Sequence, residues 1–498
     1  MIVMKFGGTS VESGEAIARL AGIVNSHLTQ RPVVVVSALG KTTNRLLEFA
    51  EHARLGDHYL GSRCLDELQD HHFEVASQIT NGESLHQIET SLQRSFRDLR
   101  VILSEVADEG REVTPALLDE IASFGERMSS EIVAAALETR GTQSVHLDAR
   151  QVILTDSRHT QARPLYWESY AKLRRVIPYL SDGRVVVMGG FIGSTEDGAT
   201  TTLGRGGSDL TASIVGAAIS ADEIQIWTDV DGMLTCDPRV LQGGYRLRSL
   251  SYQEAAALAK AGAKVLHPDT VTPAVRQRIP LVIRNSRRPE VEGTRIALSA
   301  SICSNPVKAI ACQPDLTVLE IRSKQERDSE ELAAALGEMC GRYGMPPEFL
   351  CQNNGTIFLA LKSSTRYQNL PIELEGCIEV RLHPRSAILT LVGEGIDGAS
   401  EVAARTVAAL KQIPVTMMSS TRSNLAVSLI VPSAEMHRSV EMLHREFFQR
   451  IDTTVFAECQ EAGFENPQPV STFGQPGDNP ARTGNARRFR PLTIVSQN

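Results

Sequence analysis

The residues at the start of the chain have the types and spacing needed to hold a phosphate group. Lys5 precedes the pair Gly7 and Gly8, and Thr9 and Ser10 follow that pair. Glycines let the backbone approach a ligand closely, and the free N–H groups of a following helix start attract anions. A lysine beside such a turn can act on phosphate as a point charge. The same pattern also fits an ordinary strand-to-helix turn with a solvated lysine, because short glycine motifs are weak signals.

A second glycine-rich segment carries charged and hydroxyl side chains directly before a helix. Residues 200–209 read TTTLGRGGSD, and the small-residue helical pattern of 210–219 follows at once. Glycines interleaved with such side chains at a helix start form a nest that binds anions. A merely flexible loop has no need of Arg205 and Asp209 together, so an anion site is the favoured interpretation.

Three other segments contain isolated candidates. Glu126 follows Gly125 in the middle of a predicted helix, where a glycine costs about 1 kcal/mol and indicates close packing or a nearby ligand. An ordinary helix contact explains that glycine equally well. Residues 228–232 (TDVDG) follow an alternating strand, and Lys264 follows an alanine-rich helix, where most lysines are solvated. His267 stands before a proline and is interpreted as a hydrogen-bonded structural histidine rather than a base.

Short apolar runs predict the strands that position these residues. The runs lie at 2–4, 32–37, 184–188, 223–227 and 281–284. Helical spacing predicts helices at 13–23, 46–53, 210–219 and 252–261, and a helix-rich region from 60 to 140. In an open parallel sheet a ligand binds off the carboxyl ends of the strands. The loop 37–44 is therefore predicted to be a second wall of the pocket that begins at Lys5.

The pattern changes in the second half of the chain. Strands are predicted at 318–321, 356–361, 387–392 and 425–431, and helices at 328–342, 398–411 and 433–448. Two βαββαβ-like sets fit into this length. The looser pattern of 286–300 marks the expected domain boundary. Residues 464–498 are poor in apolar side chains and are predicted to be a disordered tail.

Composition limits the classes of function. The chain has 498 residues, a formal net charge of -8 and a pI near 5.9, which gives no basic surface for nucleic acid. No apolar run approaches the roughly 20 residues that span a bilayer, and no signal peptide is visible. The eight cysteines are scattered singly, which indicates reduced thiols rather than disulfides or a metal site. We expect a cytoplasmic protein that binds neither membrane nor nucleic acid.

Four strings taken together resemble those of the aspartokinases. They are KFGGTSV at 5–11, TTLGRGGSD at 201–209, WTDVDG at 227–232 and GAKVLHP at 262–268. They occur in the family's order within residues 1–297. The resemblance implies an α/β amino acid kinase fold there, with a central, mainly parallel sheet flanked by helices. It also implies that ATP, with Mg²⁺, phosphorylates L-aspartate to 4-phospho-L-aspartate, the first step toward lysine, threonine and methionine.

The resemblance also implies residue roles. Its catalytic set is Lys5, Asp209 and Lys264, its aspartate-binding set is Thr43, Glu126, Phe191, Arg205 and Ser208, and its ATP-binding set is Lys5, Phe6, Gly7, Gly8, Thr228, Asp229, Arg239 and Lys264. Lys5 and Lys264 would neutralise the phosphates, and Asp209 would orient both lysines. Arg205 would clamp the α-carboxylate of aspartate, and Glu126 would take its α-ammonium group. No residue is assigned to a metal. Leu234 replaces a tyrosine of some relatives, which is expected to alter nucleotide stacking.

Residues 298–463 resemble the tandem ACT pair that closes aspartokinases, two ferredoxin-like βαββαβ domains with one inserted in the other. ILTLVG at 388–393 and VTMMSS at 415–420 match the second unit, which a strand near 307–311 would complete. The first unit departs from the pattern, because 322–331 is charged and NNG at 353–355 replaces a serine-rich loop. The resemblance implies feedback by lysine or threonine, with the effector left open, and a homodimer or higher homo-oligomer.

Two alternatives come from other classes. A non-catalytic amino-acid sensor could have kept the fold, but it would not need all of Lys5, Glu126, Arg205, Asp209 and Lys264, which are all present. A kinase for a different carboxylate would not need a matched anion and cation for an α-amino acid. A monofunctional aspartokinase is therefore the favoured hypothesis.

Overall fold

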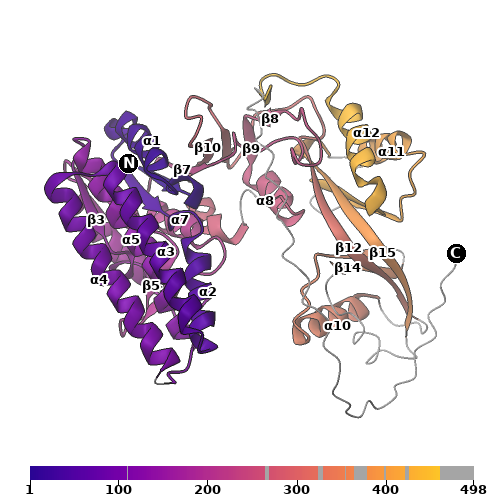
Figure 1. The fold of residues 1–498 in the computed structure, drawn as a ribbon. Helices are drawn as coiled ribbons and strands as arrows, with labels where there is room; N and C mark the ends of the chain where they lie inside the picture. The colour runs from indigo at the N-terminus through magenta and orange to yellow at the C-terminus, as the bar shows by residue number, and fades with distance from the viewer. Residues whose placement is uncertain are drawn as a thin grey trace, which may run out of the picture. The chain divides into compact units, whose positions relative to one another are not determined.

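The fold is that of a computed structural model, in which eight stretches of the chain are described (Figure 1). They are residues 1–108, 110–263, 268–323, 329–353, 355–363, 378–396, 400–420 and 425–459. Met1–Cys459 form one compact unit and Gln460–Asn498 a second, and the second lies outside the described residues. The tail predicted at 464–498 therefore stays a prediction. Among the described residues, no helix has both the length and the apolar character needed to cross a membrane.

An eight-stranded sheet organises the first half of the chain. In spatial order its strands are β3 (Ser144–Leu147), β4 (Val185–Gly189), β2 (Pro32–Val36), β1 (Ile2–Phe6), β7 (Glu223–Thr228), β10 (Leu281–Asn285), β11 (Thr294–Ala297) and β9 (Ser249–Ser251). Neighbouring strands are parallel except for the pair β10 and β11. The predicted mainly parallel sheet is confirmed, and β2 is buried on both faces, as its unbroken valine run indicates.

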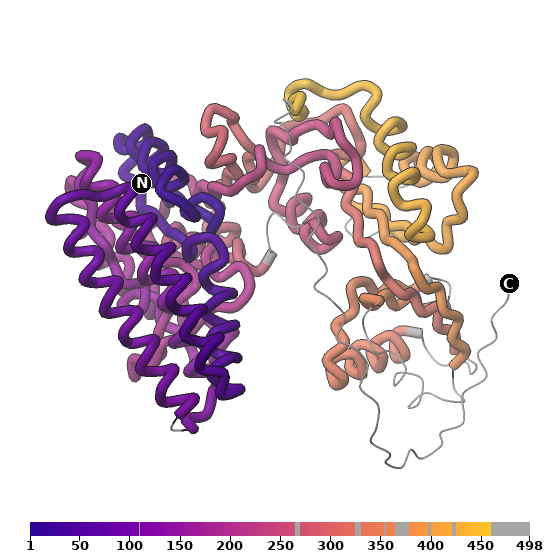
Figure 2. The backbone as a smooth tube through the Cα atoms, in the orientation of Figure 1, coloured from indigo at the N-terminus to yellow at the C-terminus, as the bar shows by residue number. Residues whose placement is uncertain are grey.

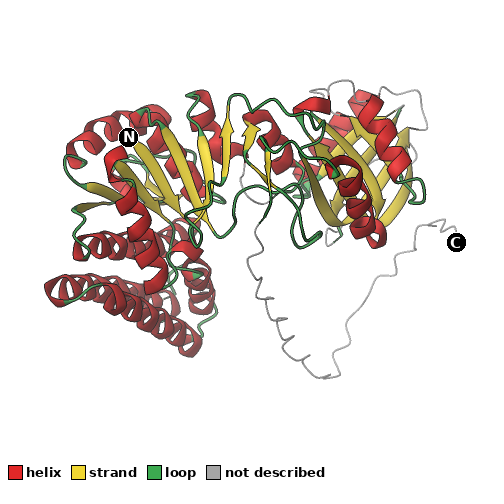
Figure 3. Cartoon of the chain, turned by 90° about the horizontal axis from the view of Figure 1, so that it is seen from above, coloured by secondary structure: helices red, strands yellow, loops and turns green. Residues whose placement is uncertain are grey.

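Helices cover both faces of this sheet (Figure 3). One layer consists of α1 (Gly14–Ser26), α2 (Thr42–Arg54), α3 (His58–Ile79), α4 (Gly82–Ala107) and α5 (Pro115–Thr139), and the other contains α6 (Tyr166–Leu180), α7 (Gly207–Ile219), α8 (Tyr252–Lys260) and α9 (Thr272–Arg276). Side chains alternate between the two faces along a strand. Met4 and Phe6 therefore pack into the core on the side of α1–α5, and Val3 packs into the core on the side of α6–α9. The strand β1 is thus held from both sides, which fixes the position of Lys5 at its end.

The second half forms one six-stranded antiparallel sheet rather than two separate ones. In spatial order its strands are β13 (Phe349–Asn353), β14 (Thr356–Lys362), β12 (Ala309–Ser323), β15 (Ile378–Val392), β17 (Ala426–Pro432) and β16 (Met417–Ser420). The helices of this half are α10 (Ser329–Arg342), α11 (Ser400–Ala409) and α12 (Met436–Phe448).

Two long strands run through both halves of that sheet, as the continuous tube in Figure 2 shows. Residues 309–313 of β12 pair with 388–392 of β15, and residues 316–323 pair with 378–386. The predicted strands at 318–321 and 387–392 covered only parts of them. The apolar pattern stops at the register shifts between Gln313 and Val318, so hydrophobicity alone showed two short strands where the backbone continues.

A buried polar contact joins the two sheets. Lys308, next to β12, places its Nζ 2.9 Å from the carboxylate of Glu254, and both side chains are almost fully buried. Glu254 also closes a capping box with Ser251 at the start of α8, and it accepts a hydrogen bond from the backbone of Glu394. One carboxylate therefore connects α8 with the ends of both long strands.

Candidate active site

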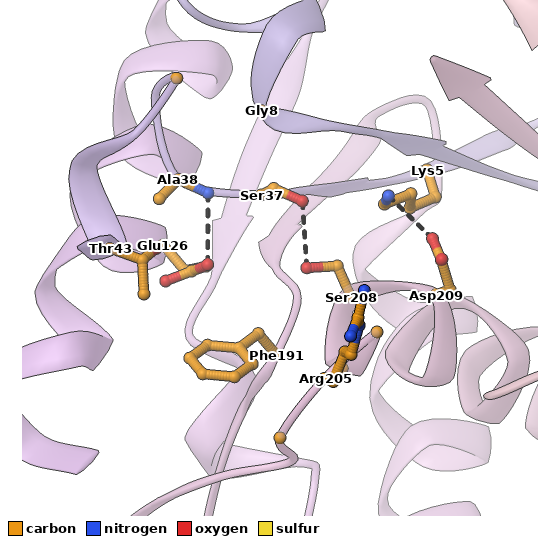
Figure 4. A pocket seen from close by; sticks show the side chains of 14 residues that line it. Lys5, Gly8, Ser37, Ala38, Thr43, Glu126, Phe191, Arg205, Ser208 and Asp209 are labelled. Carbon is orange, nitrogen blue, oxygen red and sulfur yellow. Dashed lines mark hydrogen bonds and ion pairs between the residues drawn. The ribbon is translucent and has the colours of Figure 1, made fainter. Parts of the chain in front are cut away.

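A cavity of about 470 Å³ lies where the loops after β1, β2 and β4 meet the start of α7 (Figure 4). This is the carboxyl edge of the parallel strands, where a ligand is expected in such a sheet. The lining residues are Lys5, Gly8, Ser37, Ala38, Gly40, Thr43, Glu126, Phe191, Gly204, Arg205, Gly206, Gly207, Ser208 and Asp209. The opening turn and the second glycine-rich segment, far apart in sequence, thus form one site.

One end of the cavity carries a paired lysine. The Lys5 Nζ lies 2.7 Å from Oδ1 of Asp209, which stands in the first turn of α7. Gly206, at φ 74°, turns the chain into that helix, whose start carries the positive end of the helix dipole. A side chain at Gly8 would place its Cβ 2.8 Å from the carbonyl oxygen of Gly40, so only glycine fits there. A lysine, a helix start and a backbone without side chains at Gly8 together suit a phosphate group.

A buried carboxyl group stands on another wall. Glu126 is 3% exposed, its Oε1 accepts one hydrogen bond from the Ala38 N–H at 3.3 Å, and its Oε2 has no hydrogen-bond partner in the described part of the chain. Burial raises the pKa of Glu126 to about 8. The close packing has a visible cause, because a Cβ on Gly125 would lie 2.8 Å from that of Ala38. The glycine beside Glu126 is required by helix α5 lying directly on this loop.

Arg205 brings a cation to the same cavity, and Figure 4 shows it beside Ser208. Arg205 is exposed to the cavity, and no ion pair of its guanidinium occurs among the described residues. Phe191 is held at φ 66°, a left-handed conformation uncommon outside glycine, and its N–H donates to the Thr211 hydroxyl at 3.0 Å. The Ser37 hydroxyl donates to the Ser208 hydroxyl at 3.0 Å, which joins the loop after β2 to the start of α7. A carboxyl group and a guanidinium facing one cavity suit the two charges of an α-amino acid.

Some of the predicted site residues lie outside this cavity. Phe6 is fully buried and stacks on Trp227 with ring centroids 5.9 Å apart, so its side chain cannot touch a ligand. Gly7 donates its N–H to the carbonyl of Trp227. The other predicted residues that do not line it are Thr228, Asp229 and Arg239, of which Arg239 pairs with Asp237 at 2.6 Å. Lys264 and His267 lie outside the described residues.

The cavity also contains residues that sequence analysis did not select. Ser37 and Ala38 line it directly after β2, and Gly40, Gly204, Gly206 and Gly207 complete the backbone walls. The loop 37–44 was predicted to be a wall, but only Thr43 was chosen from it. The signal was the position itself, because every residue directly after a central parallel strand lies at the ligand edge.

Comparison with known proteins agrees with this geometry. The model of the amino acid kinase family matches residues 1–285, and a model described as ACT domain matches residues 389–447. The fold and the site therefore define an amino acid kinase, a phosphotransferase class, followed by an ACT region. The predicted fold class is confirmed.

Particular relatives narrow the class. The lysine-sensitive aspartokinase 3 of Escherichia coli (strain K12) is 31% identical over 461 residues, which cover 90% of this chain and 99% of that protein. Aspartokinase 1, chloroplastic, of Arabidopsis thaliana is 32% identical over 95% of this chain and 84% of its own length. The crystal structure of E. coli aspartokinase III in complex with aspartate and ADP matches at a TM-score of 0.76, with 31% identity, over 90% of this chain and 100% of that one. This chain belongs to the aspartokinases.

Proposed function

We propose that this chain transfers the γ-phosphoryl group of ATP to the β-carboxylate of L-aspartate, giving 4-phospho-L-aspartate and ADP. The observation that carries the proposal is one cavity lined by Glu126, Arg205 and the Lys5–Asp209 pair. Glu126 and Arg205 suit an amino acid head group, and the lysine at the start of α7 suits phosphate. The related E. coli aspartokinase III has been solved with aspartate and ADP, and another of its structures holds lysine and aspartate.

The amino acid is held by its two charged groups. Arg205 binds the α-carboxylate, which a planar guanidinium can do with two parallel hydrogen bonds. Glu126 takes the α-ammonium group, which supplies the cation that its Oε2 lacks among the described residues. Thr43, Phe191 and Ser208 complete this part of the cavity. The β-carboxylate then points toward Lys5.

The transfer needs alignment and positive charge rather than a base. The β-carboxylate is ionised at neutral pH and attacks the γ-phosphorus, while the bond from that phosphorus to the bridging β,γ-oxygen breaks. Lys5 stabilises the charge on the moving group, Asp209 holds the lysine in place, and the start of α7 adds its dipole. Lys264, from a segment outside the described residues, is proposed to act as a second lysine.

Mg²⁺ fits this site through the nucleotide. Protein sites for this ion commonly supply one or two carboxylates, and substrate phosphates and water supply the other ligands. Asp209 is the lining carboxylate beside Lys5, so it would hold the ion at the phosphate end. Bound Mg²⁺ would neutralise phosphate charge.

The nucleotide is proposed to extend from the opening turn toward β7. Phe6, Gly7 and Gly8 supply backbone groups at that turn, and Gly7 is bonded to the end of β7 through Trp227. The residues proposed for the rest of the nucleotide are Thr228, Asp229 and Arg239. Thr228 and Asp229 follow β7, which is the neighbour of β1 in the sheet.

Regulation is proposed to act through the ACT region. Residues 1–297 would form the catalytic domain and residues 298–463 the ACT pair, one unit inserted in the other. The E. coli relative is named lysine-sensitive, which makes lysine the first effector to test and threonine the second. A homodimer or higher homo-oligomer and a cytoplasmic location remain predictions.

The test is an assay of ADP release by purified protein with ATP, Mg²⁺ and L-aspartate, repeated with lysine, threonine and both. Turnover that depends on aspartate supports the kinase, and a fall with one amino acid names the effector. Turnover that is indifferent to both amino acids would keep the kinase and remove the proposed effectors. No turnover with aspartate would overturn the substrate, and the sensor hypothesis would then be favoured.

A further inference from the structure

To bind both charged groups of an amino acid, a protein must hold its own anion and cation at a fixed separation. Glu126 belongs to helix α5, whereas Arg205 belongs to the turn between β6 (Thr200–Thr202) and α7. Neither side chain bonds the other, so the separation must be set elsewhere. This question rests on the proposed function, in which both residues bind aspartate.

A second carboxylate on helix α5 contacts the segment that leads to Arg205. Asp119 is 1% exposed and lies seven residues before Glu126, which is about two turns along the same helix face. Its two oxygens accept the N–H of Thr160 at 3.0 and 2.9 Å, Nδ1–H of His159 at 2.9 Å, and the hydroxyl of Thr202. A buried carboxylate with this many donors is a strong constraint on whatever carries the donors.

The donors carry the backbone that supports Arg205. Thr202 lies three residues before Arg205, and its carbonyl accepts the N–H of Ala162 at 2.9 Å. Thr160 is left-handed, at φ 70°, and is held there by Asp119. Its carbonyl oxygen would be 3.3 Å from a Cβ on Gly204, the residue before Arg205. The turn at 158–161 is therefore packed against Gly204, the residue directly before the arginine.

We propose that Asp119 is a positioning residue that fixes the distance from Arg205 to Glu126 and thereby sets the affinity for aspartate. Helix α5 carries both carboxyl groups. Glu126 binds the α-ammonium group, and Asp119 anchors the segment that holds Arg205, which binds the α-carboxylate. Asp119 does not line the cavity, so it acts through Arg205 rather than on substrate.

The first test is Asp119→Asn, which keeps the size of the side chain and replaces one acceptor with an amide donor facing bound N–H groups. Loss of hydrogen bonds to a charged group predicts a rise of about tenfold in KM for aspartate. The KM for ATP is expected to stay within about twofold, because the phosphate end is held by other contacts. The matched control is Ser144→Ala, which removes a buried hydrogen bond to α5 at the carbonyl of Ala134. It should leave both constants unchanged.

A double-mutant cycle separates positioning from general destabilisation. If Asp119 acts through Arg205, then Asp119→Asn should raise KM for aspartate less than about twofold in an Arg205→Ala background, because effects on one shared interaction are not additive. Additive effects, an equal rise in both KM values, or an unchanged KM for aspartate in the single variant would each overturn the proposal. A wild type without turnover of aspartate would instead overturn the proposed function, and this inference with it.

Thr202→Val provides a second variant if Asp119→Asn does not fold. It removes one donor to Asp119 without placing an amide in the site, and KM for aspartate is expected to rise about threefold. Thr202→Ser keeps the hydroxyl and should restore the wild-type value. Equal KM values for the valine variant, the serine variant and the wild type would overturn the proposal.

Discussion

Two ionisable residues in the same cavity are held in opposite ways. Lys5 has its counter-charge within the protein, because Asp209 lies 2.7 Å away. Glu126 is more deeply buried and has a single backbone N–H as its partner among the described residues. The lysine therefore has its counter-ion before substrate arrives, whereas the raised pKa of Glu126 keeps that carboxyl group mostly protonated at neutral pH until a ligand supplies a cation.

The first prediction concerns the pH dependence of aspartate binding. Burial raises the pKa of Glu126 to about 8, and the α-ammonium group of bound aspartate should lower it again. Binding below pH 8 should therefore release a proton, and affinity should rise with pH up to about 8, by at most about tenfold per unit. Calorimetry at pH 7 in two buffers of different ionisation enthalpy measures that proton. Buffer-independent heats would contradict the prediction, and Glu126→Gln should abolish the release.

The second prediction concerns stability of the ligand-free protein. The folded pKa of Glu126 lies above the ordinary 4.5, so between pH 4.5 and 8 the folded state keeps a proton that the unfolded state has lost. The free energy of unfolding should fall as pH rises through that range and level off above 8. Glu126→Gln removes this effect, and it should be more stable than wild type at pH 8.5, by on the order of a few kcal/mol. Thermal unfolding of the variant and the wild type at pH 5 and 8.5 tests this. The same difference in stability between the two proteins at both pH values would disprove the prediction.

The third prediction concerns the chemical step. Lys5→Ala should lower kcat by on the order of 10² or more with a smaller effect on KM for aspartate, because a charge on the moving phosphoryl group acts in the transition state. Lys172→Ala is the control, since that lysine does not line the cavity and its Nζ donates to the carbonyl of Gln151. Steady-state kinetics with saturating ATP measures both. A near-normal kcat in Lys5→Ala would remove the proposed role.

At the scale of elements, sequence pattern identified the central strands β1, β2, β4, β7 and β10 but not β3, α6 or β9, and it was a poor guide to which elements pack against each other. The valine run of β2 and the apolar start of β1 identified buried strands. Consecutive apolar side chains point to both faces of a sheet, so both faces must be covered to bury them. Lys5, at the end of β1, and Arg205 and Asp209, in the second glycine-rich segment, were also identified from the sequence. The partners did not follow: nothing in periodicity indicates that Asp119 bonds Thr160, because contacts between segments distant in sequence depend on three-dimensional packing.

The fourth prediction belongs to the layer formed by α3 and α4. His72 is buried there, its Nδ1 donates to the Leu68 carbonyl at 2.7 Å, and its ring meets that of Phe96 at 5.6 Å. Burial lowers the pKa of His72 to about 4, so between pH 6.5 and 4 the unfolded state binds a proton that the folded state excludes. Stability should fall as pH falls through that range, by on the order of 3 kcal/mol in all.

Urea unfolding at pH 7 and 4.5 measures this dependence. His72→Gln should show less loss at pH 4.5 than wild type, although it starts from lower stability. His86→Gln, on the exposed face of α4, is the control and should behave as wild type. The same loss in His72→Gln as in wild type would assign the acid sensitivity to other groups.

At the scale of the whole molecule, the fifth prediction concerns the Lys308–Glu254 pair between the two sheets. Removing one partner leaves the other charge buried, so Lys308→Met should lower stability by about 3–5 kcal/mol. The double variant with Glu254→Gln should recover part of that loss, because no unpaired charge remains. Chemical denaturation of both single variants and the double variant gives the coupling free energy between Lys308 and Glu254. Additive losses of stability would contradict the prediction. The sequence offered no sign of this pair, because a lone lysine and a lone glutamate are usually solvated.

The shared strands β12 and β15 have a consequence for how this chain can change over generations. Each strand contributes residues to both halves of the six-stranded sheet, so deleting either half would cut a strand of the other. A gene that loses one half of the sheet would encode an unpaired sheet edge in the remaining half, with its aggregation hazard. The proposed response to an effector could therefore be retuned by substitution at single positions, but not by removing or exchanging one half of the sheet.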